Sequence, residues 1–167
     1  MDRSHDEHEA LCRRCGISCH FAVPVNGLPI VVDDLHCTFL GRSDDGRFAC
    51  TVYEKRFEVA PWCATSDEAL EQGLLAQDCP YAAGVRGYRG KTRLHPRLLT
   101  PALPMIRADL LTNGAPRGLS LDGLRRFLAR TGGGDFTFVE DAAGRIRITL
   151  TVPADENGAQ DTDVVRS

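Results

Sequence analysis

Residues 12–19 read CRRCGISC, a CxxCxxxC run that sets three of the chain's seven cysteines within eight positions. A run this tight brings several thiolates to one point, and gathered thiolates bind soft or borderline metal ions. The other four cysteines all follow before residue 80. The sequence therefore predicts a metal-binding cysteine cluster over residues 10–80. The candidate ligands are Cys12, Cys15, Cys19, Cys37, Cys50, Cys63 and Cys79.

The length of 167 residues is that of one domain, with or without a tail. The charged N-terminus, MDRSHDEHEALCRR, has no apolar core of the kind found in a secretory signal. No apolar stretch approaches the roughly 20 residues that a membrane span needs. We therefore expect a cytoplasmic protein with no membrane partner, in a compartment where clustered thiols stay reduced and bind metal or carry out redox chemistry.

Local signals predict a small α+β fold in which bound metal organises the N-terminal half. An Asn-Gly pair at 26–27 between apolar runs indicates a hairpin turn. A second hairpin, with LHCTFL and RFACTVYE as its arms, is expected to present Cys37 and Cys50. Thr65 and Glu68 have the spacing of a capping box, which opens a short helix to about residue 76.

The C-terminal third is expected to supply most of the conventional core. Ser120 is the predicted N-cap of the helix LDGLRRFLAR, and the alternating runs DFTFVE and RIRITLTV flank a DAAG turn. Residues 119–152 then form a helix plus hairpin on the same domain as the cysteine region. Residues 81–118 are read as a basic, Pro/Gly-rich connecting segment with one short helix near 104–111. We expect a loose arm at 1–9 and a disordered tail at 153–167.

Zinc is the leading candidate ion, in one or two copies. Two tetrahedral sites need eight ligands, and seven cysteines with one of the adjoining histidines, His20 or His36, would supply them. The expected helix between Cys63 and Cys79 spans roughly 16 Å, so these two thiols should not share an ion. Two sites, or one site with a spare thiol, follow from that separation. The alternative is iron or a [4Fe-4S] cluster, although CxxCxxxC does not match the ferredoxin spacings.

The cysteine pattern resembles the CxxCxxCC (YkgJ-like) cysteine-cluster family over about residues 10–80. The matching pieces are CRRCGISC, then CTFL, then CTVYEKR, and then the cysteine of PWC. That family is described as a zinc- or iron-chelating domain, so the resemblance implies metal chelation by the matched cysteines. The family run usually ends in a Cys-Cys pair, whereas this chain has Ser18-Cys19.

The same resemblance covers a segment of the type tyrosine, acid, any residue, arginine and proline. Here it reads YEKRF, with phenylalanine in place of proline. Tyr53, Glu54 and Arg56 adjoin Cys50, so they are candidates for orienting the ligands from a second layer. Residues in such a position otherwise form surface ion pairs.

Charge is divided unevenly along the chain. Residues 1–80 carry 7 basic and 14 acidic side chains, whereas residues 81–130 carry 10 and 2. Basic residues interleaved with aromatic ones can follow a nucleic-acid backbone and stack on bases. The alternative is pairing with the chain's own acidic region or with a protein partner. The candidate contacts are Arg86, Tyr88, Arg89, Lys91, Arg93 and Arg97.

Three functions agree with this pattern. The leading expectation is a metal-binding protein with an accessory role and a protein partner. The second is a nucleic-acid-binding zinc module that uses residues 86–97, although the sequence pI of about 5.9 is low for such a module. The third is a metalloenzyme or metal-handling protein, in which a departure such as Ser18 creates an open coordination position. The chain has no GxSxG, P-loop or Rossmann glycine run, so an enzyme is not the leading expectation.

Overall fold

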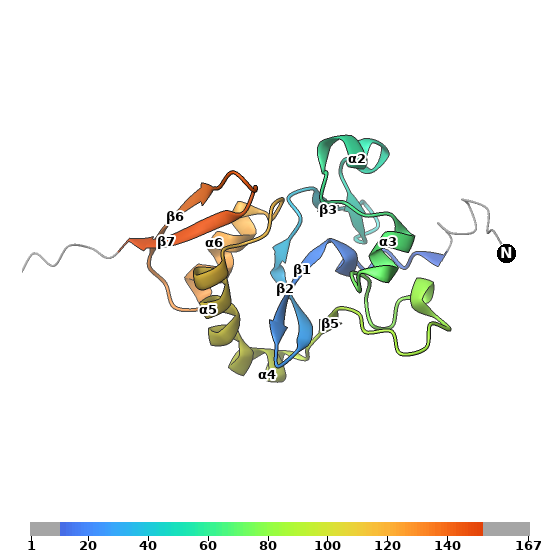
Figure 1. Ribbon diagram of the computed structural model, residues 1–167, viewed down its shortest axis with the longest axis horizontal. Helices are drawn as coiled ribbons and strands as arrows, with labels where there is room; N and C mark the ends of the chain where they lie inside the picture. The colour runs from blue at the N-terminus through green and yellow to red at the C-terminus, as the bar shows by residue number, and fades with distance from the viewer. Residues whose placement is uncertain (1–10, 152–167) are drawn as a thin grey trace, which may run out of the picture.

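The computed structural model describes residues 11–151, so the expected arm at 1–9 and the expected tail at 153–167 lie outside the described residues. The described chain is mixed α+β, as expected, with small sheets and short helices. The β1–β2 hairpin lies in the middle, with the C-terminal elements on one side and the cysteine-bearing elements on the other (Figure 1). Within 11–151, no helix is both long and apolar enough to cross a membrane.

The central hairpin confirms the turn expected at 26–27. Strand β1 (His20–Val25) pairs antiparallel with β2 (Leu28–His36). The turn residues Asn26 and Gly27 have φ angles of 50° and 78°, the left-handed pair that a tight two-residue hairpin turn needs. A short strand, β5 (Thr92–Arg93), adds parallel to β2. Two residues are too few to show periodicity, so the sequence did not predict this third strand.

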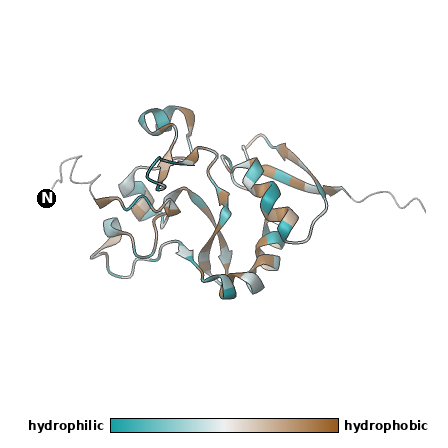
Figure 2. Cartoon of the chain, turned by 180° about the vertical axis from the view of Figure 1, so that it is seen from behind, coloured by the Kyte–Doolittle hydropathy of each residue, from teal (hydrophilic) through white to brown (hydrophobic). Residues whose placement is uncertain are grey.

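The main hydrophobic core lies between the central hairpin and the C-terminal elements. Helix α6 (Leu121–Arg130) buries Leu124, Phe127 and Leu128, which recur at helical spacing along one face. Hydrophilic and hydrophobic residues alternate along α6 in Figure 2. The Ser120 side chain accepts a hydrogen bond from the Gly123 N–H, as the predicted N-cap requires. The predicted hairpin is also present, as β6 (Asp135–Glu140) and β7 (Ile146–Thr151).

The segment at 81–118 is more regular than the expected connecting loop. The helix expected near 104–111 is present as α5 (Leu103–Asn113), and it is preceded by two short helices that were not expected, α4 (Pro96–Leu99) and η4 (Thr100–Ala102). Ile106 and Leu110 of α5 are buried in the main core. The prolines that argued for a loop lie in the first turns of these helices, where their missing N–H groups cost nothing.

The cysteine-bearing part consists of short elements joined by turns. The capping box at Thr65 and Glu68 is present, but its helix ends at Glu71 rather than near 76, and Gly73 at φ 67° reverses the chain. The second hairpin also forms, with Cys50 ending its second strand and Cys37 lying just before its first. The elements are η1 (Ile17–Cys19), β3 (Leu40–Arg42), β4 (Phe48–Cys50), η2 (Tyr53–Lys55), α2 (Arg56–Val59), α3 (Ser66–Glu71) and η3 (Pro80–Ala82).

This part of the molecule has a thin apolar interior. Between residues 37 and 90, the buried hydrophobic residues are one leucine and four alanines, namely Ala60, Ala69, Leu75, Ala76 and Ala82. None of the seven cysteines belongs to the main core cluster. Backbone turns and polar contacts therefore carry most of the described structure here.

Candidate metal centre

The CxxCxxxC run forms a tight turn whose shape depends on Gly16. This residue has a φ of 71°, which favours glycine, and an added Cβ would lie 2.6 Å from Cγ of Phe48. The Cys19 N–H donates to the Gly16 carbonyl at 3.0 Å, and the Phe48 N–H donates to the Arg14 carbonyl at 3.3 Å. The turn is therefore closed on itself and held against β4.

Four cysteines from four separate segments lie close to one another. The Cys37 N–H donates to the Cys19 carbonyl at 2.7 Å. The Leu40 N–H donates to the Cys37 carbonyl at 3.0 Å, and Leu40 is the direct cross-strand partner of Cys50. Cys63 follows a turn closed by its own N–H on the Ala60 carbonyl at 2.8 Å. We call Cys19, Cys37, Cys50 and Cys63 the four-cysteine group.

The electrostatics of this group show that its members act on one another. Burial raises the pKa of Cys19 to about 11; a hydrogen bond from Ser18 lowers it, and the Cys37, Cys50 and Cys63 thiolates raise it. Burial also raises the pKa of Cys63, Arg56 lowers it, and the Cys50 and Cys37 thiolates raise it. Mutual repulsion of this kind is what a bound cation relieves.

The remaining three cysteines form a second group. Two of them begin the CxxCxxxC run, and the third comes from a distant segment of the chain. Cys12 and Cys15 flank Arg13, whose guanidinium donates to the Asp78 carbonyl at 2.6 Å and to its carboxylate at 3.2 Å. Asp78 directly precedes the third member, Cys79. The pKa of Cys79 is raised first by burial, and the Cys15 and Cys12 thiolates also raise it. We call Cys12, Cys15 and Cys79 the three-cysteine group.

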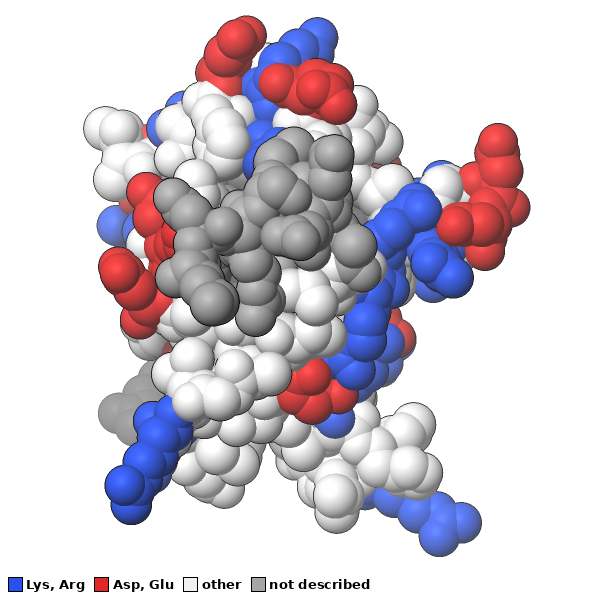
Figure 3. All heavy atoms as spheres, turned by 90° about the vertical axis from the view of Figure 1, so that its right-hand side faces the viewer, with Lys and Arg blue, Asp and Glu red and all other residues white. Residues whose placement is uncertain are grey.

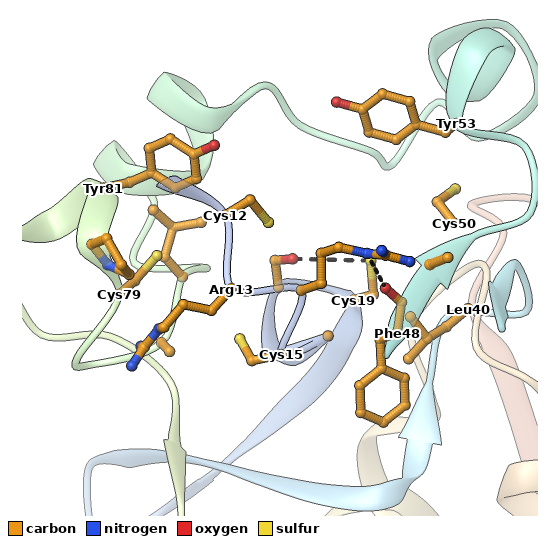
Figure 4. Close-up of a pocket in the computed structure, with 17 residues that line it drawn as sticks. Cys12, Arg13, Cys15, Cys19, Leu40, Phe48, Cys50, Tyr53, Cys79 and Tyr81 are labelled. Carbon is orange, nitrogen blue, oxygen red and sulfur yellow. Dashed lines mark hydrogen bonds between the residues drawn. The ribbon is translucent and has the colours of Figure 1, made fainter. Parts of the chain in front are cut away.

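One cavity of about 340 Å³ is lined by the whole three-cysteine group and by two members of the four-cysteine group, whereas Cys37 and Cys63 do not line it. Cys12, Cys15 and Cys79 lie at one end of it and Cys19 and Cys50 at the other (Figure 4). Its wall also includes Ser18 and a set of mostly apolar or aromatic residues. These are Leu40, Phe48, Ala49, Tyr53, Leu75, Ala76, Pro80 and Tyr81.

Cys63 and Cys79 have different cysteine neighbours, but the long helix that was expected to separate them is absent, because α3 ends at Glu71. Each group lacks the finished geometry of a metal site. Among residues 11–151, no three His, Cys, Asp or Glu side chains are close enough together to hold an ion. Six of the cysteines are partly buried, and Cys12 is exposed.

The two candidate histidines lie beside the cysteine cavity but do not line it. The Nδ1–H of His20 donates to the Gly16 carbonyl at 2.8 Å, and that of His36 donates to the Cys37 carbonyl at 3.0 Å. Their rings meet edge to face at 5.9 Å and line a separate cavity of about 270 Å³ with Asp33 and Arg93. Burial lowers the pKa of His20.

Two of the three candidate second-layer residues adjoin the cysteines. The Tyr53 side chain lines the cavity, and Figure 4 shows its hydroxyl directed toward that of Tyr81 across the cavity. The Arg56 guanidinium stacks on the Tyr53 ring at 4.0 Å, and its charge lowers the pKa of Cys63. Glu54 is exposed.

The basic segment does not present all of its candidate contacts to solvent. Tyr88 donates its hydroxyl hydrogen to the Leu75 carbonyl and accepts from the Leu75 N–H, each at 3.1 Å. Arg93 pairs with Asp33 at 3.1 Å. The exposed candidates are Arg86, Arg89, Arg93 and Arg97. On the described face in Figure 3, basic side chains lie in several places with acidic ones beside them.

Lys91 has a structural position that the sequence pattern did not reveal. Only 6 % of it is exposed, and its ammonium donates to the carbonyls of Ser18 at 2.8 Å and His20 at 2.7 Å. Burial lowers the pKa of Lys91 to about 8, and the nearby Cys19 thiolate raises it. The surrounding sequence is rich in basic residues of the kind found on surfaces, so nothing in it indicates that this lysine is buried.

Comparisons with known proteins supply no further identification. No family model, no curated protein and no solved structure matches the chain.

Proposed function

We propose that this chain is a zinc-binding protein in which the four-cysteine group holds one structural ion. The observation that supports the proposal is that backbone contacts join the segments of Cys19, Cys37 and Cys50, and that Cys63 and Cys19 each feel the charge of the other members of the group. Zinc accepts four thiolates at about 2.3 Å in a tetrahedron and needs no further ligand. The donor set is therefore complete for this ion without a histidine.

The thin apolar interior supports the same proposal. A stretch of chain that buries one leucine and four alanines has little hydrophobic stabilisation of its own. Small modules of this kind are commonly held together by a bound metal, whose binding energy becomes folding energy. A zinc ion at the four-cysteine group would join η1, the loop before β3, the end of β4 and the turn before α3.

Neighbouring cations suit a tetrathiolate site. Four thiolates around Zn²⁺ leave a net charge of −2, which is costly to bury without compensation. Arg56 acts on the charge of Cys63, and Lys91 acts on that of Cys19. Binding also needs the sulfur atoms to turn toward a common centre, and rotation about the Cα–Cβ bond is the freedom that each cysteine side chain has for this.

Metal analysis of protein purified without oxygen tests the proposal. We expect a colourless protein with at least one tightly bound zinc, and the loss of one equivalent in Cys37→Ser. Cys79→Ser, outside the four-cysteine group, is the control and should retain this ion. A folded protein without metal, or a brown protein containing iron and sulfide, would overturn the zinc assignment.

A nucleic-acid role is the alternative that the exposed Arg86, Arg89 and Arg97 still favour. Its support is weaker because Tyr88 and Lys91 are bonded internally. Salt-sensitive retention on RNA, lost in the triple alanine variant of these arginines, would favour it. The accessory role with a protein partner stays a prediction.

A further inference from the structure

A third cavity lies where the cysteine-bearing part meets the C-terminal elements. At this junction the Thr38 N–H donates to the Gly118 carbonyl at 2.8 Å, and Cys37 and Leu119 form an isolated β-bridge. The cavity has a volume of about 600 Å³, well within the range of ligand pockets, which runs from roughly 300 to 1,000 Å³. No cysteine of residues 11–151 lines it. We call it the junction cavity.

Two side chains of opposite charge in its wall have no partner. Within residues 11–151, the guanidinium of Arg117 has neither an ion pair nor a hydrogen bond, and the same holds for the carboxylate of Glu140. The other two charged residues of the wall, Asp122 and Arg125, pair with each other at 3.3 Å. One positive and one negative group are therefore left for a ligand.

Neighbouring structure holds both unpaired groups in place. The Arg117 guanidinium lies 5.6 Å from the centroid of the Trp62 ring. The stem of Arg117 packs on Gly144, where an added Cβ would lie 2.7 Å from its Cδ. Glu140 follows Phe138 by two positions on β6, so the two side chains leave the same face of the strand, and both line the cavity.

A third polar group of the wall also lacks a partner. The Nε1–H of Trp62 is buried and has no acceptor within residues 11–151. Gly118 lies against it, since an added Cβ there would lie 2.5 Å from Nε1, and this residue has no side chain that would keep a ligand atom out. Buried donors are normally paired. An oxygen atom that enters beside Arg117 is the acceptor that this wall is missing.

We propose that the junction cavity binds a free α-amino acid with a large apolar side chain. Its carboxylate pairs with Arg117 and its ammonium with Glu140. Its side chain lies against the apolar part of the wall, which includes Leu119, Leu121 and Phe138. This inference goes beyond the proposed function and does not depend on bound zinc.

The pair of unmatched charges favours a ligand that carries both signs. A simple carboxylate would satisfy Arg117 but would be repelled by Glu140, and a simple amine would meet the opposite problem. An α-amino acid carries a carboxylate and an ammonium on one carbon atom and an apolar body beside them. It therefore matches the charges and the apolar wall together.

Titration of the full chain, as purified, with L-leucine tests the proposal. Trp62 is the only tryptophan of the chain, so its fluorescence reports the occupancy of the cavity, and calorimetry gives the stoichiometry. We expect saturable binding of one leucine per chain. 4-Methylpentanoate is leucine without its ammonium, and leucinamide at neutral pH is leucine without its carboxylate. Each should bind at least about tenfold more weakly than leucine, because one charged contact is lost.

Two variants assign the charges to their residues. Arg117→Met and Glu140→Gln should each weaken leucine binding at least about tenfold. Glu140→Gln should not weaken 4-methylpentanoate, which has no ammonium to pair, and Arg117→Met should not weaken leucinamide, which has no carboxylate. Arg126→Met, on α6 but outside the wall of the cavity, is the control and should leave the affinity for leucine unchanged.

The outcomes separate this inference from the proposed function. If leucine shows no saturable binding, the amino-acid site is overturned and the zinc assignment is untouched. If 4-methylpentanoate binds as tightly as leucine, the cavity is a simple carboxylate site and the amino-acid assignment is overturned. Tighter binding of the dipeptide leucyl-leucine would overturn it in favour of a peptide. Should either variant fail to fold, the comparison of the three leucine analogues on the wild-type chain still decides the question.

Discussion

The ammonium of Lys91 lies 2.7 Å from the carbonyl oxygen of His20, the residue that follows Cys19, and so joins the basic segment to the cysteine turn. A second hydrogen bond of 2.8 Å reaches the Ser18 carbonyl. These bonds attach the residue before β5 to η1 and to the first residue of β1. The arrangement places a buried positive charge beside a candidate zinc ligand.

Lys91→Met removes these bonds but keeps a side chain of similar length. The free energy of unfolding should fall by about 1–3 kcal/mol, because buried carbonyls lose their donors. Zinc affinity should fall as well, because the charge near Cys19 is lost. Urea unfolding and competition with a chromophoric chelator measure the two effects. Arg93→Met, two residues further along the chain, is the matched control, and its exposed ion pair with Asp33 should contribute at most about 1 kcal/mol. Equal effects from both variants would contradict this role.

The stability of the metal-free protein should depend on pH through the same lysine. The folded pKa of Lys91 is about 8, below its ordinary value of 10.5. Between these values the unfolded chain binds more protons at this amine, so its contribution to the free energy of unfolding rises with pH. The stability of wild type relative to Lys91→Met should therefore increase from pH 8 to 9, by at most about 1.4 kcal/mol. Urea unfolding at both pH values measures it, and a decrease would contradict the assignment.

Removal of zinc should loosen the cysteine-bearing part while the main core stays folded. The core cluster is built from the central hairpin and the C-terminal elements, and it includes none of the cysteines. After chelation, amide hydrogen exchange over residues 37–82 should accelerate at least about tenfold, while α6 keeps its protection. Mass spectrometry of peptides from both regions measures this difference. Uniform acceleration across the chain would show instead that the metal supports the whole domain.

The thiols of the metal-free protein should differ in reactivity. Burial raises the pKa of Cys19 to about 11, so only about one in a thousand of its thiols is ionised at pH 8. Cys12 is exposed. Brief treatment with iodoacetamide should therefore label Cys12 well before Cys19, as peptide mapping will show. The denatured chain is the control, in which both should react at similar rates.

Gly16→Ala should destabilise the protein more than Gly27→Ala. Both glycines have left-handed φ angles, 71° and 78°, so both variants carry the same backbone cost of about 1–2 kcal/mol. A Cβ at Gly16 meets the Phe48 ring, whereas one at Gly27 has nothing within 4 Å. Overpacking should add about 1–3 kcal/mol at Gly16 and weaken zinc binding. Thermal unfolding compares the two, and equal losses would show that the ring moves aside freely.

Much of the local structure was predictable because short-range chemistry determines it. The turn at Asn26 and Gly27 needs left-handed residues, the helix at Thr65 begins with a capping box, and the helix after Ser120 begins with an N-cap. Each signal lies within four residues of the feature it predicts. Helix α5 was expected near 104–111, whereas α4, η4 and strand β5 had no such signal, because prolines favoured a loop at the first two and two residues are too few for the third.

The sequence by itself determined that all seven cysteines lie before residue 80. Only the tertiary structure decided which thiols are neighbours. The contact between Arg13 and Asp78 joins residues 65 positions apart, and the bond from Lys91 to His20 joins residues 71 apart. Such contacts depend on the tertiary fold of the whole chain, and the spacing of neighbouring residues carries no information about them. The division into a four-cysteine and a three-cysteine group is therefore a property of the folded molecule.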